Sequence, residues 1–259
     1  METMSMESIK LKAPAVFATS PVKEASDRYY FISTKEIIDT LKTFGWQVTS
    51  AQQQGTHKHN AHRQNFKRHL LRFRNPEIAT GENIPEIVVM NSHDRSTRFK
   101  FYAGIFRTVC MNGLIIAETK VSGLNKKHIG HIDIVNEFIE STIEKTTETL
   151  SKIREYKNTK LTQAERISIA RQAIRIHWPH SSFITPEQVL EPRREEDKGT
   201  DLWTTFNVIQ ENIMKGGMSK QLHDGRVHTT REVKNVTEIV GFNIKLWKLF
   251  KFDILDESI

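Results

Sequence analysis

Residues 86–118 read EIVVMNSHDRSTRFKFYAGIFRTVCMNGLIIAE and hold the densest apolar and β-branched run of the chain. The apolar run 87–90 is too short for a helix and predicts a strand. Residues 91–96 supply side chains that bond their own backbone in turns, so a hairpin follows. At 110–113 an Asn-Gly pair, which tolerates positive φ, predicts a second tight turn before a strand at 114–117. The stretch therefore predicts the centre of an antiparallel sheet.

The strand after the first turn alternates in character. Arg98, Lys100 and Tyr102 fall on one face of a period-2 strand, whereas Phe99 and Phe101 fall on the other. One face is predicted to enter the core and the other to be basic.

A second stretch, KRHLLRFR from Lys67, repeats this pattern. Leu71 and Phe73 share one face. The opposite face carries Arg68, Arg72 and Arg74. If both strands lie in one antiparallel sheet with helices on the apolar side, their polar faces merge into a cationic surface that includes Tyr102.

Length and composition place the chain among soluble globular proteins. Its 259 residues fit one large domain or two small ones. The single cysteine, Cys110, excludes an internal disulfide and is expected to be a buried thiol in a reducing cytoplasm. No apolar run approaches the roughly 18 residues of a membrane span, and the N-terminus lacks the apolar core of a signal peptide. We expect a cytoplasmic protein.

The positive charge is concentrated in the first half. Residues 1–131 hold 19 Lys or Arg against 11 Asp or Glu, and the remainder holds 19 against 20, so the net charge of +7 comes from the first half. Residues 46–76 contain no acid and six cations. An acid-free basic block indicates a polyanionic partner, with a solvated basic surface as the alternative.

The expected fold class is α+β, with an N-terminal antiparallel sheet and a packed helix, and a C-terminal half of amphipathic helices covering the apolar face. We divide the chain into an N-terminal arm at 1–27, a β-rich basic subdomain at 28–131 and a helical subdomain at 132–259, and we expect the two subdomains to form one continuous domain. The arm is either loose or packed on the body.

Helix signals are clear in the second half. Apolar residues recur at helical spacing from 132 to about 157, and Thr162 with Glu165 has the form of a capping box. A helix over 202–213 ends at a pair of glycines, and another covers 236–250. Residues 220–234 are polar and are expected to form a loop.

Three segments resemble a phage- and plasmid-associated family known only as domain of unknown function 932. The first matches at 91–96, 104–107 and 110–113, where the family has an NSHDxS turn, a Gly-Ile-Phe-Arg run and a Cys-x-Asn-Gly run. Two further segments match at Trp203, Phe206, Asn207, Gln210, Glu211, Asn212, Gly216 and Gly217, and at Asn243, Leu246 and Trp247. Members of the family commonly have Asp-Gly at the position of Asp94-Arg95, so in this chain a non-glycine residue must make the turn. The resemblance implies a mobile-element origin and an intracellular setting, and it supplies no catalytic residues.

The function we expect is non-sequence-specific binding of single-stranded DNA by a phage protein in replication, recombination or transcription. A backbone groove needs cations in a row, and base stacking needs exposed aromatic rings among them. The candidate binding residues are Lys58, Arg63, Phe66, Lys67, Arg68, Arg72, Arg74, Arg98, Lys100 and Tyr102. No helix-turn-helix, zinc-finger or RNP signature is present, which argues against sequence-specific readout of a duplex.

Two alternatives remain open. A metal-dependent nuclease would use His57, His59, His62, His93 and Asp94, although no spacing matches a known motif and His93-Asp94 fits a turn. An accessory protein would recruit or inhibit a polymerase or a host defence factor, and a homo-oligomer is expected in either case. No P-loop, GxSxG or GxGxxG is present, so we expect no enzyme activity and no cofactor.

Overall fold

The computed structural model describes residues 2–25, 29–55, 63–79, 81–108, 112–119, 131–179, 183–221 and 225–252. The chain divides into two compact units. The first comprises residues 1–108 and 113–147, and the second comprises residues 109–112 and 148–259.

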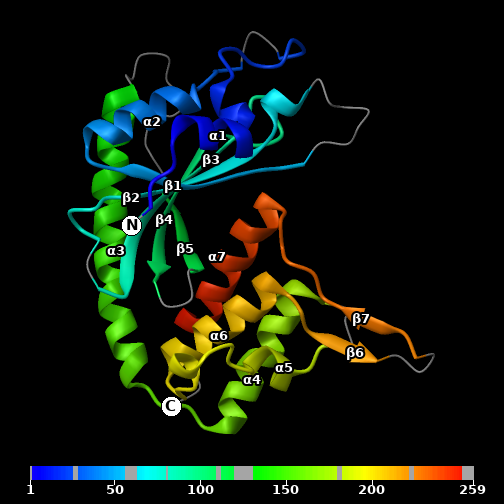
Figure 1. Cartoon of the computed structure of the whole chain (residues 1–259). Helices are drawn as coiled ribbons and strands as arrows, with labels where there is room; N and C mark the ends of the chain where they lie inside the picture. The colour runs from blue at the N-terminus through cyan, green and yellow to red at the C-terminus, as the bar shows by residue number, and fades with distance from the viewer. Residues whose placement is uncertain are drawn as a thin grey trace. The chain divides into compact units, whose positions relative to one another are not determined.

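A five-stranded sheet forms the first unit, as the sequence predicts (Figure 1). Its strands follow one another in chain order, and β1 to β4 pair antiparallel. They are β1 (Gln47–Gln53), β2 (His69–Arg74), β3 (Asn83–Asn91), β4 (Lys100–Arg107) and β5 (Asn112–Thr119). Together with the helices of the second half of the chain, this sheet makes the fold α+β.

The first face of the sheet builds a hydrophobic core with helices. Leu71 and Phe73 of β2 and Phe101 of β4 are fully buried in it. The helical side comes from α1 (Met6–Lys12), the 3-10 turn η1 (Pro14–Phe17), α2 (Thr34–Thr43) and the start of α3 (His131–Asn158). The alternation of these strands thus predicts their core-facing side correctly.

The segment expected as an N-terminal arm contributes directly to this core. Ile9, Ala13 and Val16 have no exposed surface and belong to the same cluster as the sheet residues. The backbone amide of Met4 also donates to the Val48 carbonyl of β1 at 2.8 Å. The sequence left open whether this arm is loose or packed on the body. The structure shows that residues 4–17 are packed on the sheet.

Helix α2 begins after the capping residue Ser33. The Ser33 hydroxyl accepts a hydrogen bond from the Glu36 amide at 3.3 Å, and Ile37, Ile38 and Leu41 are buried. Gly45, at φ +79°, ends the helix in the left-handed conformation expected of a glycine there.

Helix α3 is continuous over its 28 residues, close to the predicted span. Residues up to 147 belong to the first unit, where the Phe138 ring stacks on Phe101 with centroids 3.4 Å apart. The rest of the helix belongs to the second unit, where the Tyr156 hydroxyl donates to the Phe250 carbonyl at 3.3 Å.

The second unit is helical. It contains α4 (Gln163–His177), α5 (Pro186–Leu190), the 3-10 turn η3 (Glu195–Asp197), α6 (Leu202–Lys215) and α7 (Val236–Phe252). Capping boxes at Thr162 and Thr185 start α4 and α5. Helix α6 is buried along its length from Leu202 to Ile213, so it forms the centre of this unit.

The expectation of a loop over 220–234 is wrong for part of that stretch. Strands β6 (Ser219–Gln221) and β7 (Val227–Thr229) pair antiparallel in a two-stranded ribbon. The strands are polar and only three residues long, so they give no apolar alternation. The Asp-Gly pair between them is a hairpin signal in the sequence.

Among the described residues, no helix combines the length and the apolar character needed to cross a membrane.

Candidate nucleic-acid interface

Two basic segments meet at one end of the sheet. Cross-strand pairing places His69 of β2 opposite Asn91 of β3, so the residues before β2 lie beside the β3–β4 turn. Arg68 Nη2 donates to the Ser96 carbonyl at 2.6 Å, and Lys67 Nζ lies 3.2 Å from Asp94 Oδ2. Residues 63–68 and 94–100, far apart in sequence, are therefore adjacent in space.

We call the cations of these two segments the sheet-end cluster. It consists of Arg63, Lys67, Arg68, Arg95, Arg98 and Lys100. Arg95 and Arg98 are exposed, and the other four are partly exposed. Arg63 Nη2 forms an ion pair with Glu24 Oε1 at 3.0 Å, and Lys67 forms one with Asp94. Segments 63–68 and 94–100 together contain six Lys or Arg and one Asp or Glu, so this end of the sheet carries a net positive charge.

The turn that carries half of the cluster is held by its own polar side chains. Asn91 Nδ2 donates to the Ile32 carbonyl at 3.0 Å and to Thr34 Oγ1 at 2.9 Å. Ser92 Oγ accepts from the Thr97 amide at 3.0 Å, which closes the turn. The predicted turn residues thus act on the backbone, as expected of Asn and Ser in turns.

Arg95 takes the left-handed conformation in this turn, at φ +65°. Among the described residues it is the only one besides glycine with positive φ. The sequence has a non-glycine residue where family members commonly have glycine, and Arg95 makes the turn in the left-handed conformation. Arg95 was not among the candidate binding residues, although its place next to Asp94 in the turn was a sufficient signal.

Two buried histidines lie beneath the turn. His69 Nε2 is 2.9 Å from Thr34 Oγ1, His93 Nε2 is 3.5 Å from the same oxygen, and the two rings lie 5.4 Å apart. Burial lowers the pKa of His69 to about 4, against smaller opposing effects of the Lys67 carbonyl and Asp94. Burial, reinforced by His69, lowers the pKa of His93 to about 3. Both rings are therefore neutral at pH 7 and belong to the packing of the turn.

Asp94 takes part in the turn. Its Oδ1 accepts from the Ser96 amide at 3.0 Å. Burial would raise the pKa of Asp94, but the hydrogen bonds from Ser96 and Lys67 and the charge of Lys67 outweigh it and hold the pKa below its ordinary value. No group of three or more His, Cys, Asp or Glu side chains suited to a metal occurs among the described residues. His57, His59 and His62 lie outside those residues.

The expected cationic face of the sheet does not form, because β3 lies between β2 and β4 and carries a carboxylate. Arg72 Nη1 lies 2.6 Å from Glu86 Oε2, and Arg74 Nε lies 2.8 Å from Glu86 Oε1. We call Arg72, Glu86 and Arg74 the buried triad. Glu86 has no exposed surface, and the two arginines are 9% and 8% exposed. The prediction that Arg72 and Arg74 present charge at the surface is wrong.

Tyr102 on this second face is also buried. Tyr102 is 1% exposed, and its neighbours across the sheet are equally inaccessible, so the tyrosine is wrong as an exposed stacking residue. Phe66 is partly exposed, and its carbonyl accepts from the His93 amide at 2.8 Å, which places it beside the sheet-end cluster. Lys58 lies outside the described residues.

Gly113 has a role that the sequence does not predict. It lies in β5 and is not among the residues with positive φ, so the turn chemistry expected of the Asn-Gly pair is wrong for it. A Cβ at this position would lie 2.0 Å from Arg72 Nη1, and the Gly113 carbonyl accepts from Arg72 Nη2 at 2.9 Å. Glycine is needed here because the Arg72 guanidinium occupies the side-chain space.

Polar motif residues of α6 also have structural roles. Asn212 Nδ2 donates to the carbonyls of Val189 and Glu191, at 2.9 and 2.8 Å. Glu211 Oε1 lies 2.6 Å from Lys215 Nζ, and the pKa of this carboxyl is lowered because Lys215 and Arg194 outweigh its burial. These side chains fix neighbouring loops to the central helix of the second unit.

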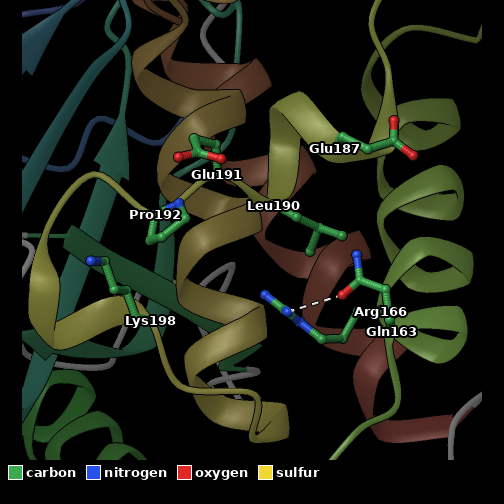
Figure 2. Close-up of a pocket in the computed structure, with 7 residues that line it drawn as sticks. All are labelled: Gln163, Arg166, Glu187, Leu190, Glu191, Pro192 and Lys198. Atoms are coloured by element: carbon green, nitrogen blue, oxygen red, sulfur yellow. Dashed lines mark hydrogen bonds between the residues drawn. The ribbon is translucent and has the colours of Figure 1, made fainter.

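A pocket of about 420 Å³ opens in the second unit. Figure 2 shows Gln163 and Arg166 on one side of it and Pro192 and Lys198 on the other, with Leu190 between. Arg166 Nη1 donates to Gln163 Oε1 at 3.3 Å. Because the lining also contains two carboxylates, Glu187 and Glu191, the pocket selects no single charge class.

The family of the chain is shown by comparison of its sequence with known proteins. A family model described as "Domain of unknown function (DUF932)" matches residues 21–240, and the chain belongs to this family. It is similar to two proteins of Escherichia coli (strain K12), named UPF0380 protein YfjQ and UPF0380 protein YafZ. Each is 33% identical over 250 residues, which cover 94% of this chain and 89% of the relative. No solved structure gives a significant match.

Proposed function

We propose that the protein binds single-stranded DNA without sequence specificity, through the sheet-end cluster. The observation that carries this proposal is the junction of residues 63–68 with 94–100, marked by the 2.6 Å bond from Arg68 to the Ser96 carbonyl. This junction gathers six cations within one rim of the sheet. A polyphosphate backbone is the ligand that such a group of cations attracts most strongly.

The rigidity of the turn supports a fixed rather than a diffuse site. The arginines at 95 and 98 project from a loop that Asn91 and Ser92 hold by hydrogen bonds. A cation that is already positioned loses less conformational entropy when it contacts a phosphate.

Aromatic side chains lie close to the cluster. Phe66 is partly exposed and contacts the turn through its carbonyl. Tyr30 is 39% exposed and follows Tyr29, whose hydroxyl donates to the Ser92 carbonyl at 2.9 Å. Stacking of a base on such a ring contributes about 1 to 3 kcal/mol. These residues replace Tyr102 as stacking candidates.

We place this activity in the cytoplasm, in DNA replication, recombination or transcription. A chain with one cysteine and a basic first half suits a reducing compartment that contains nucleic acid.

The proposal is tested by titrating a labelled DNA strand, and the corresponding duplex, across a salt series. We expect tighter binding of the single strand, with log K falling by about 0.7 per phosphate neutralised for each decade of salt. In a variant with Arg95→Gln and Arg98→Gln, the single-strand salt slope should fall by about 1.4, because two exposed cations are removed.

The matched control is Lys10→Gln with Lys12→Gln on α1, which removes the same charge from exposed positions of the same unit. Equal loss of affinity in the two variants would indicate a general charge effect and reject the sheet-end site. Arg72 and Arg74 are unsuitable for this test, since changing either leaves Glu86 partly unpaired in the interior.

A further inference from the structure

The β6–β7 ribbon is the most exposed regular element of the second unit. All six residues of its strands are exposed, and Val227 is 65% exposed. In Figure 1 the ribbon extends beyond the helices of its unit. A two-stranded ribbon alone is at best marginally stable in water, so its order must come from its base or from a partner.

The base of the ribbon is firmly attached. The Gly217 amide donates to the Thr230 carbonyl, and the Thr230 amide donates to the Met218 carbonyl, both at 2.9 Å. Gln188 Nε2 donates to the Ser219 carbonyl at 2.7 Å. At Gly216 a Cβ would lie 2.6 Å from the carbonyl carbon of Arg231, so only glycine allows this crossing of the two chain segments. The ribbon is thus held at its base with its strands exposed on both faces.

The net positive charge of the second unit lies on and beside this element. Residues 219–234 contain four Lys or Arg and two Asp or Glu, a net charge of +2. The other residues of 148–259 contain 14 of each sign. The whole positive excess of this stretch therefore lies on and beside the ribbon, at Lys220, Arg226, Arg231 and Lys234.

The side chains of the ribbon suit a groove of a nucleic-acid duplex. Gln221 presents an amide and Val227 presents methyl groups. Ser219 and Thr229 present hydroxyls that hydrogen-bond to each other at 2.7 Å and have further capacity to donate or accept. A two-stranded ribbon fits the major groove of a DNA duplex, where such groups meet base edges and thymine methyl groups while cations meet phosphates.

We propose that the β6–β7 ribbon binds duplex DNA by entering a groove, as a second nucleic-acid contact separate from the sheet-end cluster. The proposal extends the proposed function to a second form of DNA, but it depends on different residues. A protein with both contacts would engage DNA at places where single and double strands adjoin.

The test uses the full chain, a labelled DNA duplex and one of its separated strands. In a variant with Lys220→Gln and Arg226→Gln, the duplex salt slope should fall by about 2, and single-strand affinity should stay at the wild-type value. The control, Lys245→Gln with Lys248→Gln, removes the same charge from exposed positions of α7 and should leave duplex affinity unchanged. Circular dichroism should show equal folding of both variants, since none of these side chains is buried.

Duplex affinity that is equal in the ribbon variant and the wild type would overturn the inference, as would a wild-type protein that does not bind the duplex. Failure of single-strand binding, with duplex binding still lost in the ribbon variant, would reject the proposed function and support the ribbon. The reverse pattern, with loss confined to the sheet-end variant, would reject the ribbon and support the sheet-end site.

Discussion

Arginines on the face of the sheet and arginines at its end have opposite environments, although β2 and the residues before it supply both. Arg72 and Arg74 share one buried carboxylate, and the Arg74 guanidinium also lies 3.2 Å from the centroid of Phe106. At the end of the sheet, Arg68 donates to a backbone carbonyl and Arg98 is exposed.

The difference lies in what the neighbouring strand presents. Phe73 of β2 pairs with Ile87, so the adjacent Arg74 and Glu86 lie next to each other on the second face. The pairing of β2 with β3 ends at His69 and Asn91, and the cations of the sheet-end cluster lie in the segments next to this pair. Burial with a carboxylate makes an arginine a structural group, whereas a place in a turn leaves it available to a ligand.

The largest expected effect is on stability and concerns the buried triad. Glu86→Gln removes the carboxylate that neutralises Arg72 and Arg74, and leaves two guanidinium groups in the interior. Removing one partner of a buried ion pair typically costs about 3 to 5 kcal/mol, so the free energy of unfolding should fall by that amount. Urea denaturation followed by circular dichroism measures it.

The control for this variant is Glu77→Gln, which removes an exposed carboxylate of the same unit and should change stability by less than about 0.5 kcal/mol. Equal stability of the two variants would mean that Glu86 is not the partner on which the arginines depend.

The next effect concerns the histidines beneath the sheet-end turn and depends on pH. The pKa of His69 is lowered from 6.5 to about 4, so between these values the unfolded chain binds a proton that the folded chain does not. Stability is then fully present above pH 6.5 and falls as the pH drops toward 4. For His69 this difference amounts to about 3 kcal/mol, and His93 acts in the same direction.

Urea denaturation between pH 7.5 and about pH 4 checks the size of this loss. Burial also lowers the pKa of His177, so the contribution of the turn must be separated from that of the second unit. In NMR titrations the ring signals of His69 and His93 should stay at their neutral positions down to pH 5. A midpoint near 6.5 for either ring would contradict the buried arrangement beneath the turn.

Much of the fold is predictable because its signals are local. Alternation in β2 and β4 identifies the residues of the first face, and capping residues such as Thr162 mark where helices begin. The turn at 91–96 is equally local, because Asn91 and Ser92 bond to nearby backbone.

The exposure of the second face was mispredicted because it depends on how the strands pair. Whether Arg72 is exposed is decided by Glu86, which is 14 residues away and comes into contact only through strand pairing. A signal was present, since the uninterrupted apolar run 87–90 is typical of a strand buried on both faces. The requirement for glycine at position 113 likewise depends on the distant Arg72, and no turn pattern in the sequence indicates that contact.

The smallest expected effect concerns Arg95, and it separates stability from binding within the sheet-end cluster. Because Arg95 holds φ at +65°, replacing it by glycine should relieve the strain of a left-handed side chain. Part of this gain is offset by the greater freedom of glycine in the unfolded chain, so stability should rise by about 0.5 to 1 kcal/mol. Single-strand affinity should fall, since a cation of the cluster is lost.

Arg98→Gly is the matched comparison, because it removes a neighbouring exposed cation at a position without positive φ. It should lower affinity in the same way but also reduce stability, by about 0.5 to 1 kcal/mol, since glycine there brings only its entropic cost. Thermal denaturation and strand titration of both variants measure the two effects. If Arg95→Gly were destabilising, the left-handed turn would not be strained. If it left affinity unchanged while Arg98→Gly lowered it, Arg95 would belong to the turn and not to the binding surface.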